Sequence, residues 1–141
     1  MIVAKTFKWE AAHRIPWHKE KCKHLHGHSY KMVVEFEGEP DEKGFVIDFN
    51  DIKSMVEPFI KQIDHTTIIS NSDIELKEIF DQKAWRYFLL PYDSSAENLC
   101  LFFLNIILEK NRELLKNNRI TAIGIKVFET ETAYAYIKQS V

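Results

Sequence analysis

The sequence predicts an α+β domain in which a four-stranded antiparallel sheet carries two helices on one face. Two segments near the N-terminus and two near the C-terminus alternate apolar and polar residues, as half-buried strands do. Two segments between them have helical spacing, and no strand–helix–strand repeat of a parallel sheet is present. A chain of 141 residues with 45% hydrophobic composition fits one domain, residues 1–141.

The first predicted strand covers residues 2–13, and the second covers residues 26–36. In the first, one face holds the residues Val3, Phe7, Trp9, Ala11 and His13. In the second, one face holds the residues His26, His28, Tyr30, Met32, Val34 and Phe36. A loop with Pro16 and the charged run 19–23 connects the two strands, and residues 38–44 form the next turn. Histidines therefore end one apolar face and begin the other.

Two helices are predicted. Apolar residues from Ile52 to Ile63 recur at helical spacing, with Asp48 or Asn50 as the cap and a kink or late start at Pro58. The run Ser94-Ser95-Ala96-Glu97 has the form of a capping box and opens a second helix that continues past Leu99. Residues 70–93 read as a long loop with a short strand.

The last two strands are predicted at residues 123–127 and 133–137. A four-stranded sheet has two edges, and uncovered edges invite pairing with another copy of the chain. We therefore expect a homo-oligomer.

Composition excludes several functions. A net charge of −2 gives no general attraction to nucleic acids or anionic membranes. The longest apolar stretch, residues 99–108, falls well short of the roughly 20 residues that span a bilayer. With only Cys22 and Cys100 and no apolar leader, a disulfide scaffold and a secreted protein are not expected. The expected compartment is the cytoplasm.

Five of the six histidines lie within residues 13–28. The three at strand positions, His13, His26 and His28, predict a zinc site with one coordination position left for water or substrate. The alternative is that they are ordinary hydrogen-bonded histidines. His18 and His24 lie in the Lys-rich loop and are interpreted as solvated.

Other chemically active side chains keep more than one interpretation. Cys22, between Lys21 and Lys23, is a candidate base or nucleophile, a fourth zinc ligand, or an inert thiol. The pair Asp64-His65 follows the first helix. It is either an acid–base pair in which the carboxylate orients the imidazole, or simply the polar end of the helix.

For two further residues, the position in a predicted strand or helix indicates whether the side chain is buried. Glu129 extends the apolar parity of the strand before it, and it either forms an internal ion pair or accepts paired N–H groups from a planar heterocycle. Cys100 is expected to pack in the core.

Taken together, these motifs resemble the 6-pyruvoyl-tetrahydropterin synthase family nearly end to end. The segments that carry the resemblance are Phe7-x3-Ala11-Ala12-His13, Cys22-x3-His26-Gly27-His28-Ser29-Tyr30, Val46-Ile47-Asp48-Phe49, Asp64-His65, Ser95-Ala96-Glu97-Asn98-Leu99 and Val127-Phe128-Glu129-Thr130. The resemblance implies a tunnelling fold, in which subunits join edge to edge into a barrel and two rings stack as a hexamer of two trimers, with sites at subunit interfaces.

The resemblance also implies roles for residues of this chain. His13, His26 and His28 would bind Zn²⁺, Cys22 would abstract a proton, and Asp64 with His65 would form a relay. The pterin ring would contact Glu129, and Ser94 and Ser95 would lie in the segment that closes over it.

The implied reaction belongs to the 6-carboxy-tetrahydropterin synthase branch, which serves queuosine and deazapurine synthesis, because the Cys22-x3-His26 spacing is short. In that branch 7,8-dihydroneopterin triphosphate gives 6-carboxy-5,6,7,8-tetrahydropterin, acetaldehyde and triphosphate. Alternatives are the pyruvoyl-forming synthase, which eliminates triphosphate, and a non-catalytic zinc- or pterin-binding module. The longer 70–93 segment and Ser95 at a position where Thr is common depart from that branch.

Overall fold

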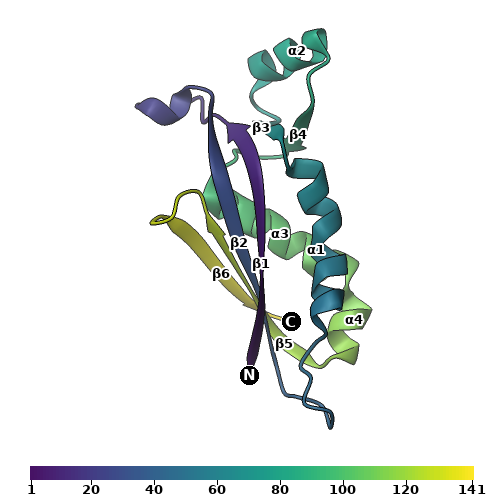
Figure 1. Ribbon diagram of the computed structural model, residues 1–141. Coiled ribbons are helices and arrows are strands. Elements are labelled where there is room, and N and C mark those ends of the chain that lie inside the picture. Colours follow the sequence, from purple (N-terminus) through teal and green to yellow (C-terminus); the bar gives the residue numbers. More distant parts are fainter.

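The computed structural model describes all 141 residues, which form one twisted mixed sheet with helices packed on one side (Figure 1). In chain order the elements are β1 Ile2–His13, the 3-10 helix η1 Lys21–Lys23, β2 His26–Gly38, α1 Phe49–Ile63, β3 Thr66–Ser70, α2 Ile74–Lys83, β4 Tyr87–Leu90, α3 Ala96–Lys110, α4 Arg112–Asn117, β5 Ile120–Phe128 and β6 Tyr134–Ser140.

The sheet has six strands in the order β4-β3-β1-β2-β5-β6, not the four that the sequence predicts. The four predicted strands are present as β1, β2, β5 and β6, and each neighbouring pair among them is antiparallel, as expected. The two additional strands, β3 and β4, run parallel to their neighbours. The antiparallel prediction is therefore right for the main sheet and wrong for this added edge.

The added strands escaped prediction because their pattern differs from that of half-buried strands. All five residues of β3 are buried, so no apolar–polar alternation marks it. β4 has only four residues and occupies the end of the stretch in which a short strand was expected.

Helix α1 is capped by Asp48, whose carboxylate accepts a hydrogen bond from the Asn50 N–H at 2.7 Å. The helix then runs to Ile63 without a late start at Pro58. Pro58 lies on the exposed side, where water can hydrogen-bond the carbonyl group that the proline leaves without an intrahelical donor.

The chain has four α-helices rather than two. The region of α2 was interpreted as a loop, and α4 was not predicted, because each helix buries little: α2 buries only Leu76 and Phe80, and α4 only Leu115. Figure 1 shows α2 at the end of the molecule beyond β3 and β4, away from the helices that cover the sheet.

The core lies between the sheet and the helices α1 and α3. Its largest fully buried side chains include Tyr30, Phe36, Phe103, Met32, Ile52 and Leu104. None of the helices combines the length and apolar character that a membrane crossing requires.

The opposite face of the sheet carries polar side chains. Tyr136 donates its hydroxyl hydrogen bond to Glu35 at 2.8 Å, and Ser29 donates to Glu10 at 2.7 Å. Along the edge of β1, only Ala11–His13 pair with β3, which leaves the earlier part of that edge without a neighbouring strand. β6 forms the other edge of the sheet.

Candidate functional site

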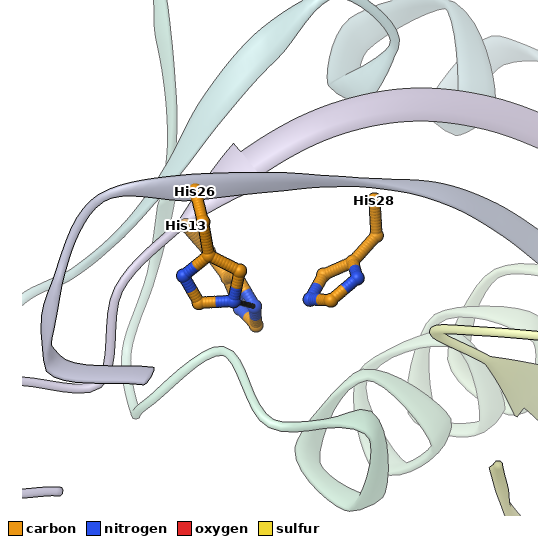
Figure 2. A group of neighbouring side chains, drawn as sticks. All are labelled: His13, His26 and His28. Atoms are coloured by element: carbon orange, nitrogen blue, oxygen red, sulfur yellow. Dashed lines mark hydrogen bonds between the residues drawn. The ribbon is translucent and has the colours of Figure 1, made fainter. Parts of the chain in front are cut away.

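Three imidazoles converge where β1 ends and β2 begins. His13 pairs with His26 across the two strands, and His28 follows two residues later on the same face. One ligand atom from each ring lies within 4.8 Å of the other two. Figure 2 shows the three rings converging from the two strands. The three rings therefore lie together on the face where strand parity places them.

Hydrogen bonds orient two of these rings. His13 Nδ1 lies 2.9 Å from the Ser94 carbonyl oxygen and 3.1 Å from its hydroxyl. His26 Nδ1 lies 2.7 Å from the His24 carbonyl oxygen. Because a carbonyl oxygen only accepts, both Nδ1 atoms carry the hydrogen and donate it, which leaves both Nε2 atoms as lone-pair donors.

The two Nε2 atoms lie 3.1 Å apart, marked by the dashed line in Figure 2. In this tautomer two lone pairs face each other, an arrangement that a cation bound by both nitrogens relieves. Metal-ligating histidines usually donate their other ring N–H to a carbonyl or carboxylate, as His13 and His26 do here. The three imidazoles, with the two carbonyl oxygens that orient His13 and His26, therefore fit a metal ion.

Two of the imidazoles, those of His13 and His28, are also in the protonation state that ligation needs. Burial lowers the pKa of His13 to about 4, with the neighbouring His26 and His28 acting in the same direction. Burial, then the proximity of His26, lowers the pKa of His28. Near neutral pH these rings are uncharged and have lone pairs available for a metal.

Cys22 lies outside the three-imidazole group. It is half-buried in η1, and its carbonyl oxygen accepts a hydrogen bond from the Ile15 N–H at 2.8 Å. The structure therefore gives no support to a closed site with this sulfur as the fourth ligand. His18 and His24 are also outside the group, as expected for residues of the loop.

Asp64 and His65 meet, with 3.0 Å between Asp64 Oδ1 and His65 Nδ1. The same Asp64 oxygen accepts the Glu10 N–H at 2.8 Å, and this hydrogen bond is the main cause of the lowered pKa of Asp64. His65 is 75% exposed and lines a hollow with Glu10 and Ser29 on the outward face of β1 and β2. His28 also borders this hollow, but no hydrogen bond or ring contact joins His65 to the three imidazoles.

Glu129 follows β5 and lies close to the imidazoles, with its Oε1 at 4.0 Å from His13 Nε2. No Lys or Arg lies within ion-pair distance of it, so the internal ion pair is not formed with either residue type. Burial, then the nearby Glu97, raises the pKa of Glu129. Both carboxylates line a pocket that also contains Ser95 and Tyr134.

Sequence reasoning missed Glu97 as a site residue because it was interpreted only as part of the capping box. It also made Ser94 the possible cap, whereas Ser95 caps α3 by accepting the Asn98 N–H at 3.3 Å. Ser94 is 1% exposed and contacts His13 instead. Cys100 is buried in the core, as predicted.

Comparison with known proteins agrees with these observations. A family model described as 6-pyruvoyl tetrahydropterin synthase matches residues 2–140. The chain is 30% identical over 132 residues to the 6-carboxy-5,6,7,8-tetrahydropterin synthase of Rickettsia typhi, covering 92% of this chain and 94% of the relative. It is 29% identical over 140 residues to the Haemophilus influenzae protein of that name, covering 94% of each chain.

Solved structures share the fold. The crystal structure of Plasmodium vivax 6-pyruvoyl tetrahydropterin synthase superposes with a TM-score of 0.80 at 22% identity, covering 100% of this chain and 99% of that one. The Caenorhabditis elegans 6-pyruvoyl tetrahydropterin synthase gives a TM-score of 0.66 at 21% identity, covering 99% and 96%. With a family model that spans almost the whole sequence, the chain belongs to the 6-pyruvoyl tetrahydropterin synthase family of pterin-synthesising enzymes.

Proposed function

We propose that this chain, as one tunnelling-fold domain, is a zinc-dependent lyase of the 6-carboxy-tetrahydropterin synthase type. Its substrate is 7,8-dihydroneopterin triphosphate, and its products are 6-carboxy-5,6,7,8-tetrahydropterin, acetaldehyde and triphosphate. The observation that carries the proposal is the group of three converging imidazoles, two of which are oriented by hydrogen bonds from Nδ1–H. The names of the curated relatives at 29–30% identity support the carboxy-forming branch.

His13, His26 and His28 would hold the Zn²⁺, which when bound acidifies hydroxyl groups and stabilises negative charge that develops on oxygen. Cys22, outside the ligand group, is then available to take up a proton from the substrate side chain. Glu129 accepts N–H groups from the edge of the pterin ring, and Glu97 borders the same pocket. Ser94 accepts the hydrogen bond that orients His13, and Ser95 lines the pocket proposed for the pterin ring.

Asp64 and His65 require a second chain in this proposal. Asp64 holds the ring of His65, which presents its other nitrogen from the outward face. Because no hydrogen bond or ring contact joins His65 to the imidazoles of its own chain, the relay to Cys22 would act between subunits. The open edge of β1 and the edge strand β6 are suited to joining such subunits into the barrel of a hexamer.

The product feeds queuosine and deazapurine synthesis, and the enzyme acts in the cytoplasm. Two free cysteines suit that reducing compartment.

The test incubates the zinc-loaded protein with 7,8-dihydroneopterin triphosphate and identifies the products by mass spectrometry. Acetaldehyde with a carboxy-pterin supports the proposal, and a pyruvoyl side chain assigns the other branch. Cys22→Ala should keep its zinc, measured by elemental analysis, and lose turnover by roughly 100-fold or more. His28→Ala should lose both. Loss of zinc in Cys22→Ala would make the thiol a ligand and refute its role as a base.

A further inference from the structure

The loop that carries Cys22 is held mainly by its own backbone. Residues 15–25 connect β1 to β2 and contain η1, which has no buried residue. Within the loop, Ile15 N–H donates to Cys22 O at 2.8 Å and His24 N–H donates to Lys21 O at 3.0 Å. These hydrogen bonds keep the loop compact but do not attach it to the body of the molecule.

A single side-chain hydrogen bond makes that attachment. Trp17 Nε1–H donates to Asp93 Oδ2 at 2.6 Å. Apart from the bond between His24 and the adjoining His26, no other hydrogen bond or ion pair joins residues 15–25 to the rest of the chain. The Trp17 ring is 68% exposed, so the N–H group rather than packing of the ring holds this contact.

Asp93 is itself fixed to the start of α3. Its carbonyl oxygen accepts a hydrogen bond from Asn98 Nδ2 in the first turn of α3 at 2.8 Å. The next residue, Ser94, contacts the candidate ligand His13. The other carboxylate oxygen, Asp93 Oδ1, is buried without a hydrogen-bond partner, so Trp17 supplies the only hydrogen bond to this carboxylate.

We propose that Trp17 and Asp93 form a latch that holds the Cys22 loop closed beside the three imidazoles. Trp17 is then a positioning residue that acts through Cys22, a role that rests on the function proposed above for that thiol. The latch links two segments that the function needs together: the loop with Cys22 and the segment with Ser94.

Removing the Trp17 N–H should open the loop. In the closed state the Asp93 carboxylate would then have no donor from the protein, and its buried oxygen Oδ1 would stay unsatisfied. An open loop lets water reach Oδ1. A hydrogen bond to a charged group is strong enough that its loss should increase the open population about tenfold.

Limited trypsin digestion tests the latch without any substrate, because Lys19, Lys21 and Lys23 are cleavage sites within the loop. Trp17→Phe keeps an aromatic ring and removes the N–H group, and cleavage in the loop should become about tenfold faster. Trp85→Phe is the matched control, since Trp85 is 55% exposed and its indole N–H makes no hydrogen bond. Its cleavage rate should equal that of the wild type. An unchanged rate in Trp17→Phe overturns the latch.

A double-mutant cycle tests whether the two residues act as one contact. Asp93→Ala should accelerate cleavage as much as Trp17→Phe, and the double variant should be no faster than either single variant. Asp93→Asn keeps an acceptor oxygen and should restore much of the protection. Effects that multiply in the double variant would show that the two residues act independently and would overturn the proposal.

Activity measurements separate the latch from the proposed function. If both hold, Trp17→Phe lowers kcat for 7,8-dihydroneopterin triphosphate while KM and zinc content stay at wild-type values. A raised KM with unchanged kcat would overturn the positioning of Cys22. If Cys22→Ala retains full turnover, the proposed role of the thiol fails, and the digestion rates alone decide whether the latch exists.

Discussion

At the scale of single residues, the site depends on the hydrogen bonds that the Nδ1 atoms of His13 and His26 make. His13 and His26 each donate Nδ1–H to a carbonyl oxygen, so the direction of the Nε2 lone pair is set by the backbone. His13 is 1% exposed, and burial keeps its ring neutral. His18 and His24 belong to the same stretch of sequence but stay outside the group, because only strand positions bring rings to one face.

Glu129→Gln tests the proposed contact with the pterin ring. The substitution keeps the size of the side chain and removes the charge that strengthens paired N–H hydrogen bonds, so pterin affinity should fall roughly 10-fold or more. Zinc content should be unchanged. Fluorescence titration with a dihydropterin measures the affinity, and Glu131→Gln, an exposed neighbour, is the control. Wild-type affinity in Glu129→Gln would remove this carboxylate from the pocket.

At the scale of elements, α3 begins beside the site, and its cap has a structural role. Ser95→Ala removes the hydroxyl oxygen that accepts the Asn98 N–H and should lower the free energy of unfolding by about 1 kcal/mol. Urea unfolding measures the change. Ser95→Asp supplies another capping oxygen and should retain most of the stability. An equal loss in both variants would contradict a capping role.

The element α2 is attached to the end of β1 through an ion pair. Arg14 donates two hydrogen bonds to Asp73, both at 2.6 Å, and Asp73 also caps α2. The Arg14 hydrogen bond is the main reason why the pKa of Asp73 is lowered, against the opposing effect of burial. The residue after the candidate ligand His13 therefore anchors the segment that was interpreted as loop.

Asp73→Asn keeps a capping oxygen and removes the charge. It should lower the free energy of unfolding by about 1.5 kcal/mol at pH 7. The folded pKa of Asp73 lies below its ordinary value of 3.8, so the unfolded chain binds more protons in acid. The stabilisation is complete above that ordinary value and is lost as pH falls through the folded pKa. Measured by urea unfolding, the free energies of unfolding of the wild type and of Asp73→Asn should become equal as the pH is lowered. Glu75→Gln, at a 77% exposed carboxylate, is the control and should change stability by less than about 0.5 kcal/mol.

At the scale of the whole molecule, the open edge of β1 is the feature that the proposed assembly requires. Glu10 shows the direction in which the even-numbered residues of β1 point their backbone groups. Its N–H donates to Asp64 and its carbonyl oxygen accepts the His65 N–H, both on the side away from β2. By strand alternation, Thr6 directs its N–H to the part of this edge that has no partner.

Thr6→Pro should therefore remove a donor from the open edge without breaking the β1–β2 pairing. We expect the wild type to elute as a hexamer and the variant as smaller species in size-exclusion chromatography with light scattering. Thr6→Val keeps the N–H and should assemble normally. A monomeric wild type would refute the barrel, and a fully assembled Thr6→Pro would place the subunit contact elsewhere.

Much of this molecule was predictable from local pattern. The strands β1, β2, β5 and β6 show the alternation of half-buried strands, and the same parity that places Tyr30 and Phe36 in the core places His26 and His28 on the core face. The motif order along the chain indicated the family that the comparison then confirmed.

Tertiary structure decided what local pattern does not contain. β3 is buried on both faces and so lacks a period, and α2 depends on Asp73 reaching Arg14 across 59 positions of sequence. Only the folded chain shows that Ser94 holds His13, that Glu97 lies near Glu129, and that His65 contacts Asp64 and none of the three imidazoles. Periodicity reports the face on which a side chain lies, whereas its partners depend on which distant segments the fold packs against that face.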